Sequence, residues 1–108
     1  MHTPSTTILI GKRLDCVNAP VFKRLLAARI RNGQHTLLID LTQTDYLGIP
    51  GLRMLLEMQA YAHSNGGELV LTGLQPGVQQ VFSRTNALKT FSHHPSPLDG
   101  VDSAPFRC

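Results

Sequence analysis

The sequence predicts an α/β fold in which helices pack on a small, mostly parallel mixed sheet of four or five strands. Short apolar runs of strand character alternate along the chain with segments whose apolar residues recur at helical spacing. The connections carry turn residues, such as Asn32-Gly33 and the Asn-Gly-Gly run at 65–67. An order of strand, helix, strand, helix, strand, helix produces a parallel-leaning sheet with right-handed crossovers.

The first strand and helix occupy the first third of the chain. Residues 6–10 are β-branched and apolar and predict a strand, after which the chain continues through Leu14 to Asp15. Asn18 is suited to cap a helix, and Pro20 falls in its first turn, where a missing N–H costs nothing. The predicted buried face of this helix consists of Val21, Phe22, Leu25, Leu26 and Ile30.

A central strand, loop and helix follow. The apolar run at 37–41 predicts a strand buried on both faces, and the polar residues 42–45 leave the sheet. Pro50 sits where a second helix can begin. The predicted sheet-facing side of this helix consists of Leu52, Leu55, Leu56, Gln59, Ala60 and His63.

The last third predicts one more strand and helix before a tail. Residues 68–72 read as a second central strand, 73–77 as a turn, and Val78, Val81 and Phe82 as one face of a helix. Residues 88–91 are short enough for a final strand or an extended stretch. Residues 1–91 therefore predict one domain, and the prolines and histidines of 92–108 predict a flexible tail.

Composition excludes several classes of function. The chain has 108 residues and a formal net charge of +3, but its basic residues form no run and Trp is absent. We therefore expect no nucleic-acid binding. The amino end has no apolar signal-peptide region and no segment is long enough to cross a membrane, so we expect a cytoplasmic protein.

Neither a metal site nor a catalytic group is predicted. Cys16 and Cys108 lie far apart without metal-type spacing, and the adjacent His93 and His94 point apart in a strand or coil. No nucleophile, base and orienting group are brought together by the pattern, so we expect neither an enzyme nor a cofactor.

The central segment resembles the signature of STAS domains, the anti-sigma factor antagonist family. Asp40-Leu41-Thr42 resembles the Asp-Leu-Ser that ends the family's strand, and Gly51-Leu52 resembles the end of its Asp-Ser-Ser-Gly-Leu helix start. Arg13-Leu14-Asp15 resembles the family's Gly-x-Leu-Asp turn. The resemblance runs from about Thr7 to Phe91. It implies a STAS-like fold, with one opening strand fewer than usual, and an exposed sheet edge that makes a homodimer plausible.

The resemblance also places a proline at the family's phosphoacceptor position. In phosphorylatable members the second Ser of Asp-Ser-Ser-Gly accepts phosphate, and the same register here gives Gly48, Ile49, Pro50 and Gly51. Because Pro50 has no hydroxyl, the resemblance implies a member that is not switched at the usual site. Thr42 and Thr44, in the preceding loop, are alternative acceptors that the sequence leaves open.

On the strength of this resemblance, we expect a non-enzymatic protein-binding module of a bacterial regulatory system. Its partner would be an anti-sigma factor, a GHKL-type kinase or a similar protein. Leu47 and Ile49 would supply apolar contact, Pro50 a rigid helix start and Arg53 an orienting charge. The predicted partner surface consists of Tyr46, Leu47, Gly48, Ile49, Pro50, Gly51 and Arg53.

Two other functions remain open from the sequence. STAS-like subunits also accompany lipid-transporting ABC systems, and this chain could be such an accessory subunit. Some relatives bind nucleotides or small apolar molecules, which would make it a ligand-sensing module.

Overall fold

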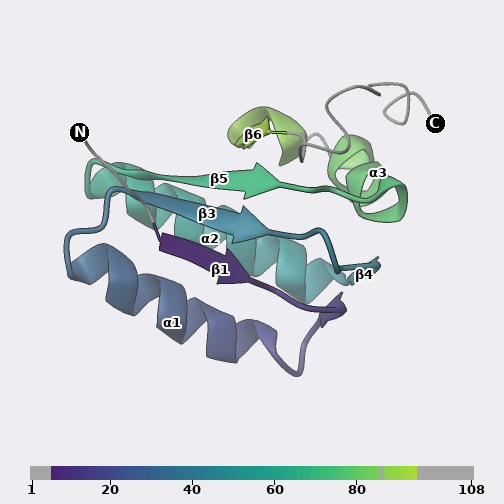
Figure 1. Ribbon diagram of the computed structural model, residues 1–108, viewed down its shortest axis with the longest axis horizontal. Coiled ribbons are helices and arrows are strands. Elements are labelled where there is room, and N and C mark those ends of the chain that lie inside the picture. The colour runs from purple at the N-terminus through teal and green to yellow at the C-terminus, as the bar shows by residue number, and fades with distance from the viewer. Residues whose placement is uncertain (1–5, 86, 95–108) are drawn as a thin grey trace.

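The computed structural model describes residues 6–85 and 87–94, and Figure 1 shows their arrangement. The strands are β1 (Thr6–Leu9), β2 (Arg13–Leu14), β3 (Thr36–Asp40), β4 (Tyr46–Leu47), β5 (Glu68–Thr72) and β6 (Ser92–His94). The helices are α1 (Ala19–Arg31), α2 (Ile49–Ser64) and α3 (Pro76–Arg84), followed by a 3-10 helix, η1 (Ala87–Thr90).

The main sheet has four strands in the order β1-β3-β5-β6. Each pair is parallel, with Ile8 beside Ile39 and Ile39 beside Leu71. The predicted α/β class and the mostly parallel, four-stranded sheet are confirmed, and every described pair in this sheet is parallel. Successive strands of this sheet are joined through helices, and a crossover of that kind returns the next strand in the same direction.

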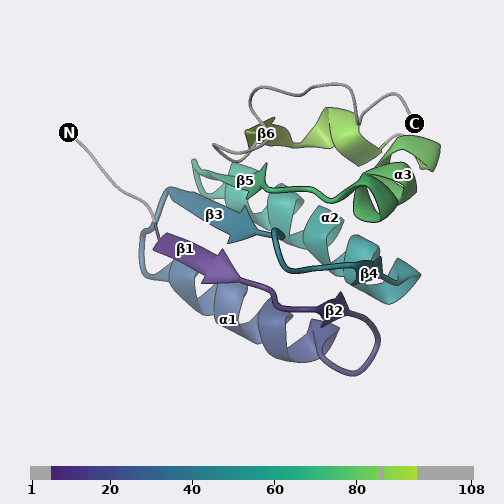
Figure 2. The same cartoon turned by 45° about the vertical axis from the view of Figure 1, so that its right-hand side comes forward.

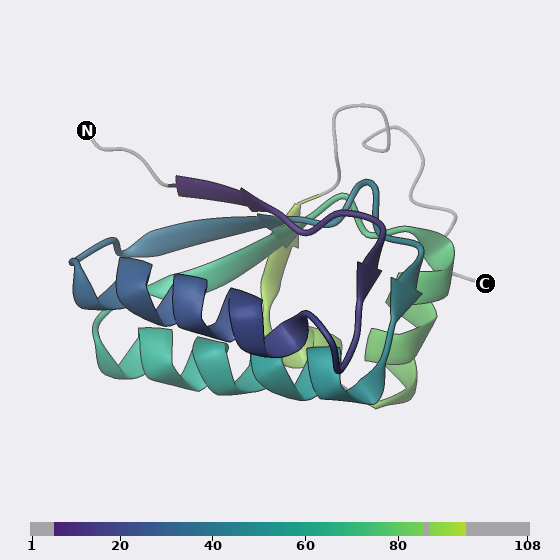
Figure 3. The ribbon, with the colours of Figure 1, turned by 90° about the horizontal axis from the view of Figure 1, so that it is seen from below.

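The core lies between this sheet and the helices. Figure 3 shows α1 and α2 side by side under one face of the sheet. Alternate strand residues point toward them, because successive side chains of a strand leave on opposite faces. These side chains, all buried, are Ile8, Leu37, Ile39, Leu69 and Leu71.

The buried helix faces differ in part from the predicted ones. In α1, Leu26 and Ile30 are buried as predicted, whereas Val21 is 53% exposed. In α2, Leu52, Leu55 and Gln59 are buried as predicted, whereas Ala60 and His63 are exposed. The reason is that α2 packs against both α1 and β5, so Met54, Met58 and Ala62 are buried as well and its polar face is narrow.

The end of the described chain also differs from the prediction. Residues 87–90 form η1 and not a strand, and the strand β6 follows within the segment predicted as a tail. Phe91 explains the shift, since its ring is buried edge-to-face on Phe82, with centroids 5.8 Å apart. The helical turn lets Phe91 fill this end of the core before the chain joins β5. Residues 95–108 of the predicted tail lie outside the described residues.

Candidate functional site

A short second ladder holds the predicted partner surface beyond the ends of the main sheet. Figure 2 shows β2 and β4 side by side there. They pair in parallel, with Arg13 beside Tyr46 and Leu14 beside Leu47. The Gly48 N–H then donates to the Leu14 carbonyl at 2.9 Å, and α2 begins at the next residue. The backbone hydrogen bonds between β2 and β4, and from Gly48 to Leu14, therefore fix the segment that leads into α2.

Gly51 lets the first turn of α2 approach β2 closely. A Cβ atom at this position would lie 2.7 Å from Leu14 Cγ, 2.8 Å from the Leu14 carbonyl oxygen and 3.1 Å from Leu47 Cδ1. A backbone oxygen cannot move aside as the end of a side chain can, so any larger residue would push α2 away from β2. Gly51 thus positions the site and is itself buried.

The predicted surface divides into an exposed and a buried part. Tyr46 is 45% exposed and Ile49 53% exposed, and Pro50 and Arg53 are exposed as well. We call these four residues the α2-start surface. Leu47 is only 5% exposed and belongs to the core, so it supports the surface from below and does not present apolar contact as predicted.

Arg13 borders the α2-start surface, a neighbour that the sequence prediction missed. Its guanidinium lies 4.5 Å from the centroid of the Tyr46 ring, and its Nε donates to Asp15 Oδ2 at 3.2 Å. A cation over an aromatic face holds the ring in place. The Arg13-Leu14-Asp15 turn would have indicated this contact if the pairing of β2 with β4 had also been predicted.

Asp15 organises the turn that leads into α1. Its Oδ1 accepts the N–H of Val17 at 3.0 Å, and the Asn18 side chain accepts the Asp15 N–H at 2.9 Å. The Val17 N–H, with smaller contributions from Arg13 and Asn18, holds the pKa of Asp15 below its usual value. Asn18 occupies the predicted N-cap position but makes no side-chain cap hydrogen bond, because its side chain is used in this turn.

The start of α2 has no charged or hydroxyl side chain. Its N-cap is Gly48, which makes no side-chain cap hydrogen bond, and its first turn contains a proline and no acidic residue. The first N–H groups of a helix lack partners within the helix and give this end a partial positive charge. The α2-start surface is consequently apolar at Ile49 and Pro50, with weak positive potential below it.

The two threonines left open as alternative phosphoacceptors differ in access. Thr44 is fully buried, and its hydroxyl donates to the Gly11 carbonyl, so it cannot meet another protein's active site without local unfolding. Thr42 is exposed, and its hydroxyl donates to Asp40 Oδ1 at 2.6 Å. Of this pair, only Thr42 keeps a hydroxyl near the surface.

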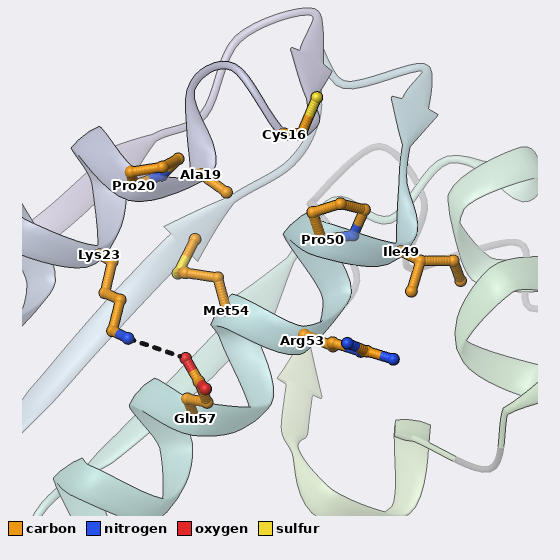
Figure 4. A pocket seen from close by; sticks show the side chains of 9 residues that line it. All are labelled: Cys16, Ala19, Pro20, Lys23, Ile49, Pro50, Arg53, Met54 and Glu57. Atoms are coloured by element: carbon orange, nitrogen blue, oxygen red, sulfur yellow. Dashed lines mark ion pairs between the residues drawn. The ribbon is translucent and has the colours of Figure 1, made fainter.

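A groove of about 390 Å³ lies next to the α2-start surface, between the first turns of α1 and α2 (Figure 4). Its central residues are apolar, with Met54 of α2 reaching toward Ala19 and Pro20 of α1. Cys16 lies at one end, and an ion pair of 3.1 Å between Lys23 and Glu57 closes the other. Ile49, Pro50 and Arg53 belong to both the groove and the α2-start surface.

Within residues 6–85 and 87–94, no three His, Cys, Asp or Glu residues are grouped closely enough to hold a metal ion. No helix among the same residues combines the length and apolar character needed to span a bilayer.

The chain is similar to proteins that are named as anti-sigma factor antagonists. BtrV of Bordetella bronchiseptica, named as one, is 33% identical over 78 residues, which cover 72% of this chain and 67% of BtrV. An anti-sigma factor antagonist from Mycobacterium paratuberculosis superposes with a TM-score of 0.78 at 23% identity, over 94% of this chain and 86% of that one. The antagonist SpoIIAA in its unphosphorylated form gives 0.74 at 17% identity, over 94% and 90%.

The family model for the STAS domain matches residues 2–99. This match covers both β-ladders, the three α-helices and the α2-start surface. The chain belongs to the STAS domain family.

Proposed function

We propose that this chain is a protein-binding regulatory module of the anti-sigma factor antagonist type, which docks through the α2-start surface. The partner would be an anti-sigma factor or GHKL-type kinase in the bacterial cytoplasm. The similarity to BtrV supports the class of protein. The observation that carries the proposal is the exposed, uncharged pair Ile49 and Pro50 at the first turn of α2.

The proposed module is not switched by phosphate at this surface. A phosphoserine at a helix start adds roughly 1.5 to 2 negative charges. Burying these charges against an apolar partner would cost desolvation free energy and weaken binding. Pro50 has no hydroxyl to accept phosphate, so the first turn of α2 gains no negative charge by phosphorylation at the usual position. Binding would then be controlled by the amount of the protein or by its partner.

Ile49 and Tyr46 would supply the apolar contact, and Arg53 the orienting charge. Interfaces of this kind place aromatic and aliphatic anchors at the centre and charges at the rim. Arg13, which holds the Tyr46 ring at 4.5 Å, would pre-order that anchor and reduce the entropy lost on binding.

An affinity capture from the native cytosol tests the proposal. The tagged native chain is compared with Pro50→Asp, which places a negative charge on the α2-start surface, and with Ala60→Asp, which places one at an exposed position further along α2. We expect an anti-sigma factor or GHKL-type kinase to be captured by the native chain and Ala60→Asp, and lost with Pro50→Asp.

The opposite pattern would overturn the proposal. If the same proteins are captured by all three forms, the α2-start surface is not the docking site. Capture of ABC transporter subunits would favour the accessory-subunit function, and a nucleotide or lipid retained through purification would favour a ligand-sensing module.

A further inference from the structure

The groove between α1 and α2 has the size and lining of a site for apolar side chains. Its volume of about 390 Å³ falls in the range of ligand sites, and a cavity of about 150 Å³ already admits a benzene ring. The groove is therefore large enough for roughly two apolar side chains. Ala19, Pro20, Ile49, Pro50 and Met54 supply its apolar surface.

The helices that form the groove carry a strong excess of positive charge. Their five basic side chains are Lys23, Arg24, Arg29, Arg31 and Arg53. Their one acidic residue is Glu57, which is paired with Lys23. Within the described residues, none of the four arginines forms an ion pair. Arg29 and Arg31 lie in the last turn of α1, away from the groove. At the groove itself Lys23 is paired with Glu57, so Arg53 is the lining charge that favours an occupant with a negative group.

Recognition at this site would come from side chains. Both walls are first turns of helices, and the groove contains no strand edge to which an extended peptide could add. An amphipathic helix suits such a groove, because two residues at i and i+3 or i+4 can enter together while its polar face stays outside.

We infer that the α1–α2 groove binds an acidic amphipathic helix of the protein partner. Two apolar side chains of that helix enter between Pro20 and Met54, and a carboxylate on its flank pairs with Arg53 at the rim. This inference rests on the proposed function and adds the chemistry of the partner's docking element. The groove and the α2-start surface share Ile49, Pro50 and Arg53, so one partner can contact both.

Two synthetic helical peptides test the charge requirement. Both carry Leu at i, i+3 and i+4 positions; one has Glu on the flanks and the other has Lys at the same places. Binding to the full native chain is measured by fluorescence anisotropy, and the contact residues by amide shifts of the labelled protein. We expect the acidic peptide to bind at least about tenfold more tightly than the basic one. The shifts should concentrate at Ala19, Arg53 and Met54.

Arg53→Glu provides the decisive variant, with Arg84→Glu as its matched control at an exposed position ending α3. The charge reversal at Arg53 should weaken the acidic peptide at least about tenfold, whereas Arg84→Glu should change its affinity less than about twofold. A glutamate in the first two turns of α2 is compatible with the helix dipole, so the fold should be kept.

Several outcomes would overturn the inference. These are equal binding of the two peptides, no binding of either at millimolar concentration, or amide shifts away from the groove. If the acidic peptide does not bind, but vesicles of anionic lipid bind the native chain and not Arg53→Glu, then the positive charge at Arg53 serves membrane binding and the inference is wrong. If the acidic peptide does not bind as predicted but Pro50→Asp still abolishes capture of the partner protein, the proposed function stands. If the acidic peptide binds as predicted but Pro50→Asp captures the partner protein as well as the native chain does, only the proposed docking surface is refuted.

Discussion

Replacing Gln59 by Ala should destabilise the fold strongly, because this polar side chain is buried and fully hydrogen-bonded. Gln59 is 1% exposed. Its Oε1 accepts the Leu69 N–H at 2.7 Å, and its Nε2 donates to the carbonyls of Leu69 at 3.2 Å and Thr90 at 2.9 Å. One side chain thus joins α2 to β5 and to the end of η1.

The expected magnitude follows from these three hydrogen bonds. Each contributes roughly 0.5 to 1.5 kcal/mol net, so their loss should cost about 3 kcal/mol, with the cost of the vacated space in addition. For a domain of this size, each kcal/mol lowers Tm by about 4 to 8 °C, which gives a fall of roughly 12 to 24 °C.

Urea denaturation followed by circular dichroism measures the change. Gln80→Ala is the matched control, because Gln80 is exposed on α3 and its replacement should alter the free energy of unfolding by less than about 0.5 kcal/mol. A loss below about 1 kcal/mol for Gln59→Ala would refute the reasoning, since Leu69 and Thr90 would then find other partners at no cost.

Three further predictions concern the elements around the site. Gly51→Ala should lower the free energy of unfolding by about 1 to 3 kcal/mol in a urea titration, because its Cβ would lie 2.8 Å from the Leu14 carbonyl oxygen; an unchanged midpoint would contradict the close approach of α2 and β2. Asp15 has a folded-state pKa below 3.8, so its carboxylate stabilises the fold above that value, and this contribution is lost as the pH falls through the folded pKa. The native chain should therefore lose more stability than Asp15→Asn between about pH 5 and pH 3, and parallel losses would contradict this. Glu57→Gln breaks an exposed ion pair and should cost less than about 1 kcal/mol, an effect that about 1 M NaCl should remove; a larger, salt-independent loss would contradict an exposed pair.

The main elements could be predicted from sequence because their signals are local. The alternating apolar runs, the early prolines of the helices and the Asn-Gly turns located α1, α2, β3 and β5 close to their observed bounds. The last segment could not be predicted in this way. The conformation of residues 87–94 depends on the contact between the Phe91 and Phe82 rings, which forms only in the packed fold.

The candidate site was predictable as a segment but not as a surface. The order of motifs predicts a site at 46–51, whereas the burial of residues within this segment depends on the pairing of β2 with β4. Lys12 and Asp45, which form an ion pair beside that ladder, are 33 positions apart, and no local pattern announces such a contact. The same holds for Arg13 on Tyr46, for the burial of Leu47 and for the groove between the two helices.

The most direct test of the account incubates the native chain with its purified captured partner and ATP. Intact mass and complex formation are then measured together, with Pro50→Ser, which restores a hydroxyl to the first turn of α2, in parallel. We predict that the native chain gains no phosphate on the α2-start surface and stays bound in ATP. For Pro50→Ser, we predict that any phosphate gained is accompanied by release. A native chain that takes up phosphate on the α2-start surface, located by peptide mapping, and then dissociates would contradict the central claim that this surface is not switched by phosphorylation.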